Sequence, residues 1–264
     1  MAATPEHHED QIELIETKRA GDDAMPAVLA VLPLGDIVVF PGMIAPLVVT
    51  TARSIKLVEE TVAGSRFLIA ALQRVGTQAD DVVALSDLHP QGCIARVLKM
   101  LRFPDDTVRV LVQGVSRCRI KEPETASPFL RCTYEVNPDQ MEDTIELAAL
   151  ARSATQVFTE IITLSPTLPD ELKIAVVNIE DPGRLADLLA TNLNLSLEDR
   201  QTLLAETRAK ARLEKLSPLL NRERTLLLAV HKAQAEHTIE VVDGLVRTLT
   251  EIRKELPPGV RLEP

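Results

Sequence analysis

The residues of this sequence that could bind a metal or act as nucleophiles are its five histidines and three cysteines. His7 and His8 form the only adjacent histidine pair, and a metal site needs further ligands at fixed positions beside such a pair. His231 and His237 are six residues apart, which on a helix directs their side chains away from each other. The cysteines form no C-x-x-C pair and lie at positions 93, 118 and 132. We therefore expect no metal, no disulfide framework, and buried thiols in a cytoplasmic protein.

Motifs for nucleotide binding and nucleophilic catalysis are absent from the sequence. No glycine is followed by lysine, which excludes the phosphate-binding loop G-x-x-x-x-G-K-[ST], and no G-x-G-x-x-G occurs. Neither G-x-S-x-G nor S-x-x-K is present, so no serine nucleophile is indicated. A site assembled from distant residues escapes such a search. We expect a chain that is not an enzyme on its own and that needs no cofactor.

Composition restricts the class of partner. The net charge is −10, the aromatic fraction is 2%, and one tyrosine is present without any tryptophan, which argues against nucleic-acid binding. No apolar run of 18 residues occurs and the N-terminus has no apolar leader, so we expect neither membrane insertion nor export. One region carries eight basic residues against four acidic ones: Arg96, Lys99, Arg102, Arg109, Arg117, Arg119, Lys121 and Arg131. This surplus indicates either an RNA-binding sheet edge or, as is commoner, the solvated side of a half-buried sheet.

The stretch 31–49 offers an apolar surface instead of a reactive group. It is rich in Val, Leu and Ile, and three prolines divide it into short extended pieces, because each proline fixes φ and lacks a hydrogen-bond donor. Patches that contain methionine adapt to varied partners, so this bend is our predicted site for a substrate or partner protein. The predicted site residues are Leu34, Phe40, Pro41, Met43 and Pro46. The alternative is that all of them belong to the core.

Patterning with a period of two over residues 26–137 predicts a small, partly closed β-barrel. A short helix over 54–63, ended by Gly64, interrupts the strands. Pro104-Asp105-Asp106 predicts a hairpin turn. The strands expected after the helix are 67–72, 93–103, 107–113, 115–121 and 129–136.

The sequence texture changes at Asn137, and residues 138–217 predict an α-helical bundle. Asp139 with Glu142 resembles a capping box at the start of its first helix, and Asp181 and Ser196 are expected to cap later helices. Residues 218–264 predict a long C-terminal helix and tail. Its heptad positions include Leu228 and favour packing on its own bundle or on a sister chain over a mobile arm. The acidic residues 1–25 are expected to remain mobile or to form at most one short helix. The β-barrel followed by the helical bundle gives the predicted fold class, α+β.

Several of these segments together resemble the amino-terminal domain of Lon, the ATP-dependent protease. The resemblance covers about residues 28–228, and it includes Leu32 to Leu47, Asp106 to Gly114, and Asp181-Pro182-Gly183. It implies a pseudo-barrel related to the PUA fold, followed by the bundle. It also implies recognition of unfolded or tagged client proteins in ATP-dependent proteolysis, whereas ATPase and Ser–Lys protease modules do not follow in this sequence. Gly35 departs from the family, which usually has Arg or Lys there.

Three hypotheses for function follow. The first is a non-catalytic module whose barrel, with its junction to the bundle, holds apolar segments of client proteins or of a partner such as an AAA+ protease. The second is RNA binding through the PUA-like half. The third is a regulatory or self-associating scaffold that forms a homo-oligomer through the long C-terminal helix. We favour the first, because the apolar bend and the resemblance agree and the charge opposes the second.

Overall fold

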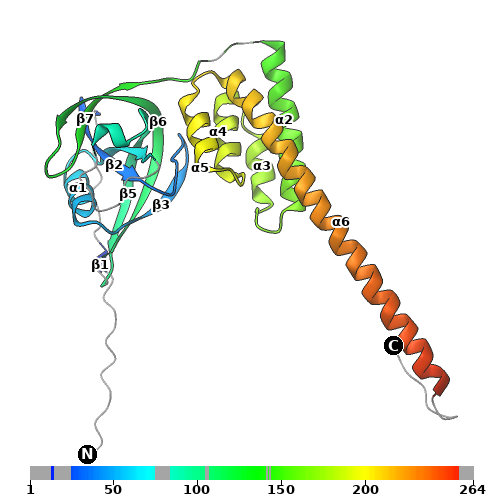
Figure 1. Cartoon of the computed structure of the whole chain (residues 1–264). Helices are drawn as coiled ribbons and strands as arrows, with labels where there is room; N and C mark the ends of the chain where they lie inside the picture. The colour runs from blue at the N-terminus through cyan, green and yellow to red at the C-terminus, as the bar shows by residue number, and fades with distance from the viewer. Residues whose placement is uncertain are drawn as a thin grey trace, which may run out of the picture.

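The chain folds into two units that lie side by side, a β-barrel from its N-terminal half and a helical bundle from its C-terminal half (Figure 1). The computed structural model describes residues 13–14, 25–74, 84–104, 107–140, 142 and 144–255, and within these ranges it describes side chains from residue 25 to residue 233. The predicted α+β class is confirmed. The predictions for residues 1–12 and 15–24, including the His7-His8 pair, lie outside the described residues.

Five strands close the barrel into a ring. β5 pairs with β4, β4 with β2, β2 with β7, β7 with β6, and β6 again with β5. Closure leaves no exposed edge among these five strands. The short β1 and the longer β3 are added at the outside, on β5 and β6 respectively. The bounds are β1 Glu13–Leu14, β2 Val28–Leu34, β3 Ile44–Val49, β4 Phe67–Leu72, β5 Gln91–Arg102, β6 Val108–Thr125 and β7 Arg131–Val136.

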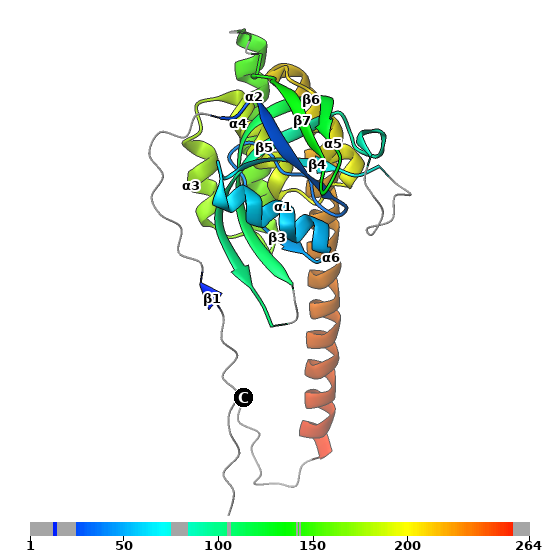
Figure 2. The same cartoon turned by 90° about the vertical axis from the view of Figure 1, so that its left-hand side faces the viewer.

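Helix α1 (Ala52–Ala63) is the helix that the sequence predicts between the strands of the barrel. Thr51 caps its N-terminus, because its Oγ1 accepts a hydrogen bond from the backbone N–H of Ser54 at 3.2 Å. Gly64 follows its last turn as predicted. The helix lies against the strands (Figure 2) and buries Leu57 and Val58. A single turn of 3₁₀-helix, η1 (Leu85–Asp87), precedes β5.

Strand β6 corrects one prediction, because the expected separate strands 107–113 and 115–121 are one continuous strand. Gly114 does not interrupt it; instead the register with β5 shifts there. The backbone of Gly114 binds the bend after β2 by two hydrogen bonds, from its N–H to the oxygen of Met43 and from the N–H of Gly42 to its own oxygen. A Cβ at Gly114 would lie 2.0 Å from the oxygen of Phe40. Only glycine allows this close approach.

The bundle contains helices α2 to α6. α2 begins later than predicted, because Thr144 rather than Asp139 caps it and accepts from the N–H of Leu147 at 3.2 Å. Asp181 and Ser196 cap α4 and α5, as predicted from their side chains. The bounds are α2 Ile145–Leu164, α3 Glu171–Val177, α4 Pro182–Asn192, α5 Leu197–Ala205 and α6 Ala209–Glu255.

Helix α6 begins at Ala209, earlier than the predicted start near Pro218, and continues through that proline to Glu255. Pro218 has no N–H for the carbonyl of Glu214, which removes one helical hydrogen bond. Leu216 and Leu220 on either side of the proline are buried, and this packing offsets the loss. α6 extends well past the other helices (Figures 1 and 2). Among the described residues, none of the helices combines the length and apolar character needed to cross a membrane.

The main apolar cluster runs from the barrel into the bundle. It includes Leu32 and Phe40 of the barrel together with Phe158 and Leu189 of the bundle. A second, smaller cluster fills the other side of the β2–β4 pair and includes Ile69, Cys118 and Cys132. Because one cluster crosses the boundary, the two units share buried surface and the junction between them is part of the fold.

Candidate functional site

Strand β3 carries an exposed apolar face. Ile44 is 57% exposed, Val48 is 63% exposed, and Pro46 lies exposed between them. The alternate residues, which face inward, are buried: Ala45, Leu47 and Val49. Within the described sheet β3 pairs with β6 alone, so this face belongs to an outer strand. Apolar side chains that are gathered on an uncovered strand are typical of interaction sites. We call Ile44, Pro46 and Val48 the β3 stripe.

The five residues of the predicted site do not share one surface. Leu34 and Phe40 are buried in the core at 8% and 0% exposure, and Pro41 and Met43 are partly buried. Pro46 alone is exposed and lies in the β3 stripe. Sequence reasoning missed Ile44 and Val48, although residues 43–49 are apolar at every position, which gives an outer strand an apolar face on both sides. The binding role of the five residues stays a prediction.

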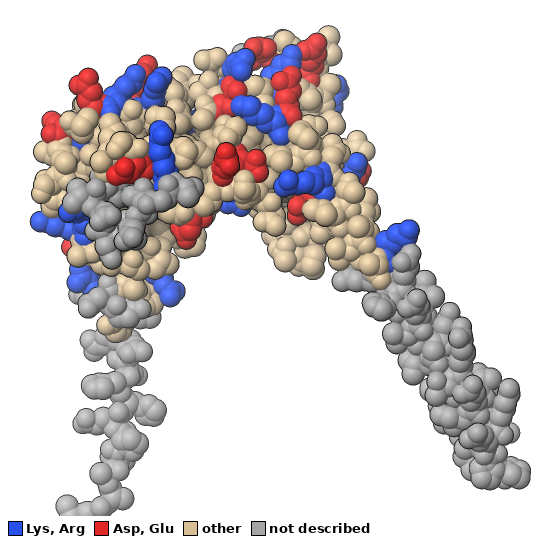
Figure 3. Space-filling model, in the orientation of Figure 1, with Lys and Arg blue, Asp and Glu red and all other residues tan. Residues whose placement is uncertain are grey.

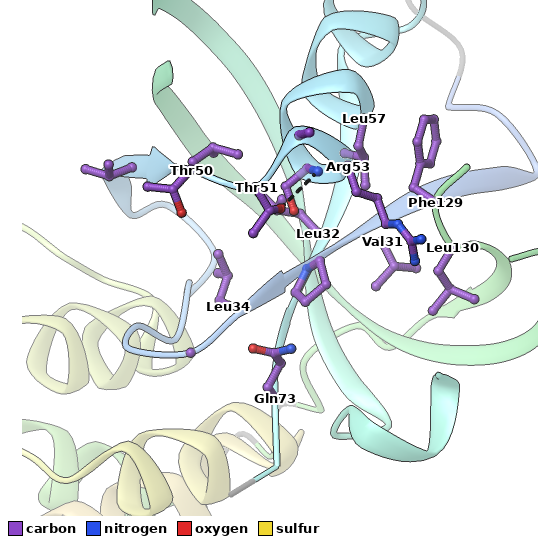
Figure 4. Close-up of a pocket in the computed structure, with 16 residues that line it drawn as sticks. Val31, Leu32, Leu34, Thr50, Thr51, Arg53, Leu57, Gln73, Phe129 and Leu130 are labelled. Atoms are coloured by element: carbon purple, nitrogen blue, oxygen red, sulfur yellow. Dashed lines mark hydrogen bonds between the residues drawn. The ribbon is translucent and has the colours of Figure 1, made fainter. Parts of the chain in front are cut away.

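A cleft of about 530 Å³ opens beside the end of β3 (Figure 4). Leu32 and Leu34 of β2 line it on one side, and Thr50, Thr51 and the first turn of α1 line it on another. Val48 also belongs to the lining, so the β3 stripe leads into this cleft. The cleft therefore continues the apolar surface into a concave region where a side chain could be buried.

A second cavity, of about 760 Å³, lies at the junction of barrel and bundle. On the bundle side α5 lines it, and on the barrel side the ends of β4 and β5 do so. Gly35 and Gln73 line both this junction cavity and the cleft, so the two hollows adjoin. A Cβ at Gly35 would lie 3.7 Å from Oε1 of Gln73. Gly35, where the resemblance leads one to expect Arg or Lys, thus contributes no side chain to the lining of either hollow.

The charged groups of the junction cavity balance. Arg74 and Glu198 have opposite signs and both line the cavity. Partial burial, together with the charge of Arg74, lowers the pKa of His89, so its imidazole is neutral at pH 7. The cavity thus offers mainly uncharged polar groups and apolar side chains to a ligand.

Four charged residues, three of them buried and one partly exposed, hold the barrel and the bundle together. Arg117 of β6 and Arg212 of α6 each have side chains 1% exposed, and both bind Asp187 of α4. Arg117 Nη1 lies 2.8 Å from Asp187 Oδ2 and Arg212 Nη1 lies 2.7 Å from Asp187 Oδ1. Asp139, in the segment between the two units, binds both arginines. We call these four residues the junction network.

Burial opposes the charges of Asp187 and Arg117 in the junction network. It raises the pKa of the Asp187 carboxyl, and the hydrogen bonds and charges of Arg117 and Arg212 act against that rise. Burial likewise disfavours the charged form of Arg117, yet its pKa is raised, because hydrogen bonding to Asp187 and the two carboxylates outweigh the burial. Gly183 leaves room for the guanidinium of Arg212, because a Cβ at this position would lie 2.8 Å from Nη2 of that arginine. The network fixes how the walls of the junction cavity face each other.

From the sequence, Asp139 is expected to cap a helix and Arg117 to belong to a basic surface. The sequence holds only one weak local indication of the junction network. Asp187 lies between the inward-facing Ala186 and Leu189 of α4, and an acidic residue on the buried side of a helix indicates a buried partner. The identity of that partner depends on tertiary structure.

The basic residues of the hairpin region are largely engaged in contacts within the chain. Arg117 is buried in the junction network. The guanidinium of Arg109 lies 4.4 Å from the ring centroid of Phe103. Salt bridges on the barrel join basic residues to acidic ones: Arg102–Glu59, Lys121–Glu135 and Arg131–Glu60. Figure 3 shows acidic and basic side chains interspersed on the face in view. This arrangement favours the solvated-sheet interpretation over an RNA-binding edge.

The three cysteines are free and buried. Burial raises the pKa of the Cys118 thiol to about 12 and that of Cys132 to about 11, and it raises the pKa of Cys93 as well. At pH 8 a thiol of pKa about 11 is ionised to roughly one part in a thousand. We expect no reaction of the folded chain with 5,5′-dithiobis(2-nitrobenzoate) over one hour at pH 8, and three thiols per chain after unfolding in guanidinium chloride. Rapid modification of the folded chain would contradict this burial.

The sequence model of the "ATP-dependent protease La (LON) substrate-binding domain" matches residues 28–222, which is most of the chain. The chain belongs to this family. Lon protease of Dictyoglomus thermophilum is 35% identical over 237 residues, and Lon protease of Roseiflexus castenholzii is 37% identical over 233 residues. In each comparison the match covers 88% of this chain and about 30% of the relative. The chain therefore spans less than a third of the Lon proteases that it resembles.

Solved structures of Lon domains have the same fold. The N-terminal domain of Mycobacterium avium complex Lon protease superposes with a TM-score of 0.60 at 22% identity, covering 74% of this chain and 98% of that one. A Lon N-terminal domain protein from Xanthomonas campestris gives a TM-score of 0.50 at 20% identity, covering 72% and 96%. The resemblance found in the sequence is confirmed, and the chain has the fold of a Lon substrate-binding domain.

Proposed function

We propose that this chain is a non-catalytic binding module that holds unfolded or tagged client polypeptides in the cytoplasm, on their way to an AAA+ protease of the Lon type. The β3 stripe is the observation that carries the proposal, because it leads through Val48 into the cleft and from there to the junction cavity. This surface suits an extended apolar segment, whose side chains would enter the hollows in turn. The family's description as a substrate-binding domain supports the same role.

The side chains of the described structure that could react are largely buried or engaged within the fold. Among the described residues no group of three His, Cys, Asp or Glu side chains could hold a metal ion. Burial favours the neutral form of the thiols, and the charged residues of the junction network form ion pairs with one another. The cleft and the junction cavity offer apolar, hydroxyl and amide groups together with the charged Arg53, Arg74 and Glu198, and such a mixture suits the binding of a polypeptide.

Val48→Asp tests the proposal at the point where the β3 stripe enters the cleft. We expect the variant to bind reduced, carboxymethylated α-lactalbumin at least about tenfold more weakly, because a carboxylate must lose its hydration to lie against an apolar client. Val48 is a better probe than the predicted Met43, since Met43 is partly buried against the core and a charge there would perturb the fold. Fluorescence anisotropy with labelled lactalbumin gives the dissociation constants.

Val136→Asp is the matched control for Val48→Asp. Val136 is an exposed valine at the end of β7, 41% exposed and outside both hollows. It should retain the affinity of the unchanged chain within about twofold. Equal affinity of the Val48 and Val136 variants would remove the β3 stripe from the binding surface, and failure of the unchanged chain to bind the client would reject the proposed function.

A further inference from the structure

The junction cavity has two buried glutamines in its lining, Gln91 of β5 at 8% exposure and Gln201 of α5 at 5% exposure. Each uses one half of its side-chain amide. Gln201 Nε2 donates to the backbone oxygen of Gln91 at 2.9 Å, and Gln91 Oε1 accepts from Asn137 Nδ2 at 3.3 Å. The other two atoms, Gln91 Nε2 and Gln201 Oε1, have no hydrogen-bond partner within the described structure. One side of the junction thus has an unused donor and the other an unused acceptor.

An unused buried donor and acceptor destabilise the fold, so such groups normally have partners. Gln91 and Gln201 both line a cavity large enough for part of a peptide, but the two unused atoms themselves are covered, so a ligand reaches them only after the side-chain amides rotate. The cavity has Arg74 and Glu198 of opposite sign beside a neutral imidazole, so neither an anion nor a cation is favoured by net charge. The ligand that fits this chemistry is neutral and offers one acceptor and one donor.

We propose that Gln91 and Gln201 bind the backbone of a single residue in an extended polypeptide, with Gln91 Nε2 donating to its carbonyl and Gln201 Oε1 accepting from its N–H. This assignment rests on the proposed function and adds to it how the client is recognised. In an extended chain the N–H and the C=O of one residue point to the same edge, as they do in an antiparallel strand pair. The terminal torsion of glutamine has broad minima, so rotation about it, with exchange of the present bonds to Gln91 O and Asn137, brings both amides to face such a residue.

Recognition of this kind reads the backbone and not the side chains. Every residue except proline offers the same N–H and C=O pair, so the contact is independent of the client's sequence. It also requires an extended segment, because in a helix both groups are already bonded within the chain. The junction cavity thereby distinguishes unfolded from folded polypeptides, while the β3 stripe binds their apolar side chains.

N-methylation of a peptide ligand tests the assignment without changing the protein. The probe is an acetylated, amidated hexapeptide of alternating valine and alanine, titrated into the full chain by isothermal calorimetry, followed by the series in which each backbone nitrogen in turn is methylated. We expect one position at which methylation weakens binding about tenfold or more, since it removes the N–H that Gln201 Oε1 accepts, and changes below about threefold at most other positions. A series with no sensitive position would overturn the assignment.

Gln201→Met provides the coupling measurement. In this variant the sensitive position should lose its sensitivity, because the acceptor is absent, whereas Gln73→Met, which alters another residue of the cavity lining, should leave the sensitivity in place. Equal sensitivity in the Gln201 variant would overturn the assignment. If the hexapeptide fails to bind while carboxymethylated lactalbumin still binds, the assignment is wrong and the proposed function stands; if neither binds, both are wrong.

Discussion

Replacing Asp187 by asparagine is expected to lower the free energy of unfolding by about 3–5 kcal/mol, the cost typical of removing one partner from a buried ion pair. Asparagine has the same shape, but it leaves Arg117 and Arg212 facing each other with Asp139 as their one carboxylate. Both guanidiniums remain out of water at 1% exposure. Urea unfolding, followed by circular dichroism, measures the change.

Glu60→Gln is the control for Asp187→Asn. Glu60 forms a salt bridge with Arg131 at 3.1 Å, but their side chains are 42% and 41% exposed. Exposed pairs contribute about 0–1 kcal/mol, so this variant should unfold almost as the unchanged chain does. A loss of similar size in both variants would mean that burial of the junction network does not decide its contribution.

Replacing Gly114 by alanine is the second change with a large expected effect, a loss of about 3 kcal/mol or more in the free energy of unfolding. The new Cβ would lie 2.0 Å from the oxygen of Phe40 and 2.8 Å from its carbonyl carbon, and both are backbone atoms that cannot rotate away. The bend at 40–43 must therefore move off β6 and lose its two hydrogen bonds to residue 114. Thermal unfolding of the two chains measures the loss.

Gly35→Ala serves as the comparison, because the nearest atom to its Cβ would be Oε1 of Gln73 at the ordinary contact distance of 3.7 Å. We expect a change within about 0.5 kcal/mol for this variant, as for most substitutions away from tightly packed positions. Unchanged stability of the Gly114 variant would show that the bend is not held against β6 by close backbone contact.

Features that depend on neighbouring residues could be predicted from the sequence. The cap of α4 at Asp181 and the cap of α5 at Ser196 need only a side-chain oxygen before an amphipathic segment. Strand β4 needs only its apolar run. The resemblance to Lon came from the same local segments, and it led to the correct family.

Features that depend on distant partners could not be predicted. Asp139 resembles a helix cap until Arg117 and Arg212 are known to reach it from other elements. Pro218 resembles a helix terminus until the burial of the leucines around it is known. In the candidate site, the apolar run around Pro46 indicates a strand, but only the exposure of alternate residues and the pairing of β3 with β6 alone show that one of its faces remains uncovered.

Helix α6 runs from the joint between barrel and bundle, along the bundle as far as His231, and on beyond the other helices. Arg212 lies in its first turn, and its helical backbone continues to Glu255. At about 1.5 Å per residue those 43 steps span about 65 Å. A tilt of about 5° of this helix, together with the bundle, around the salt-bridged joint would displace its far end by about 6 Å, so a small change of angle between barrel and bundle becomes a large displacement there.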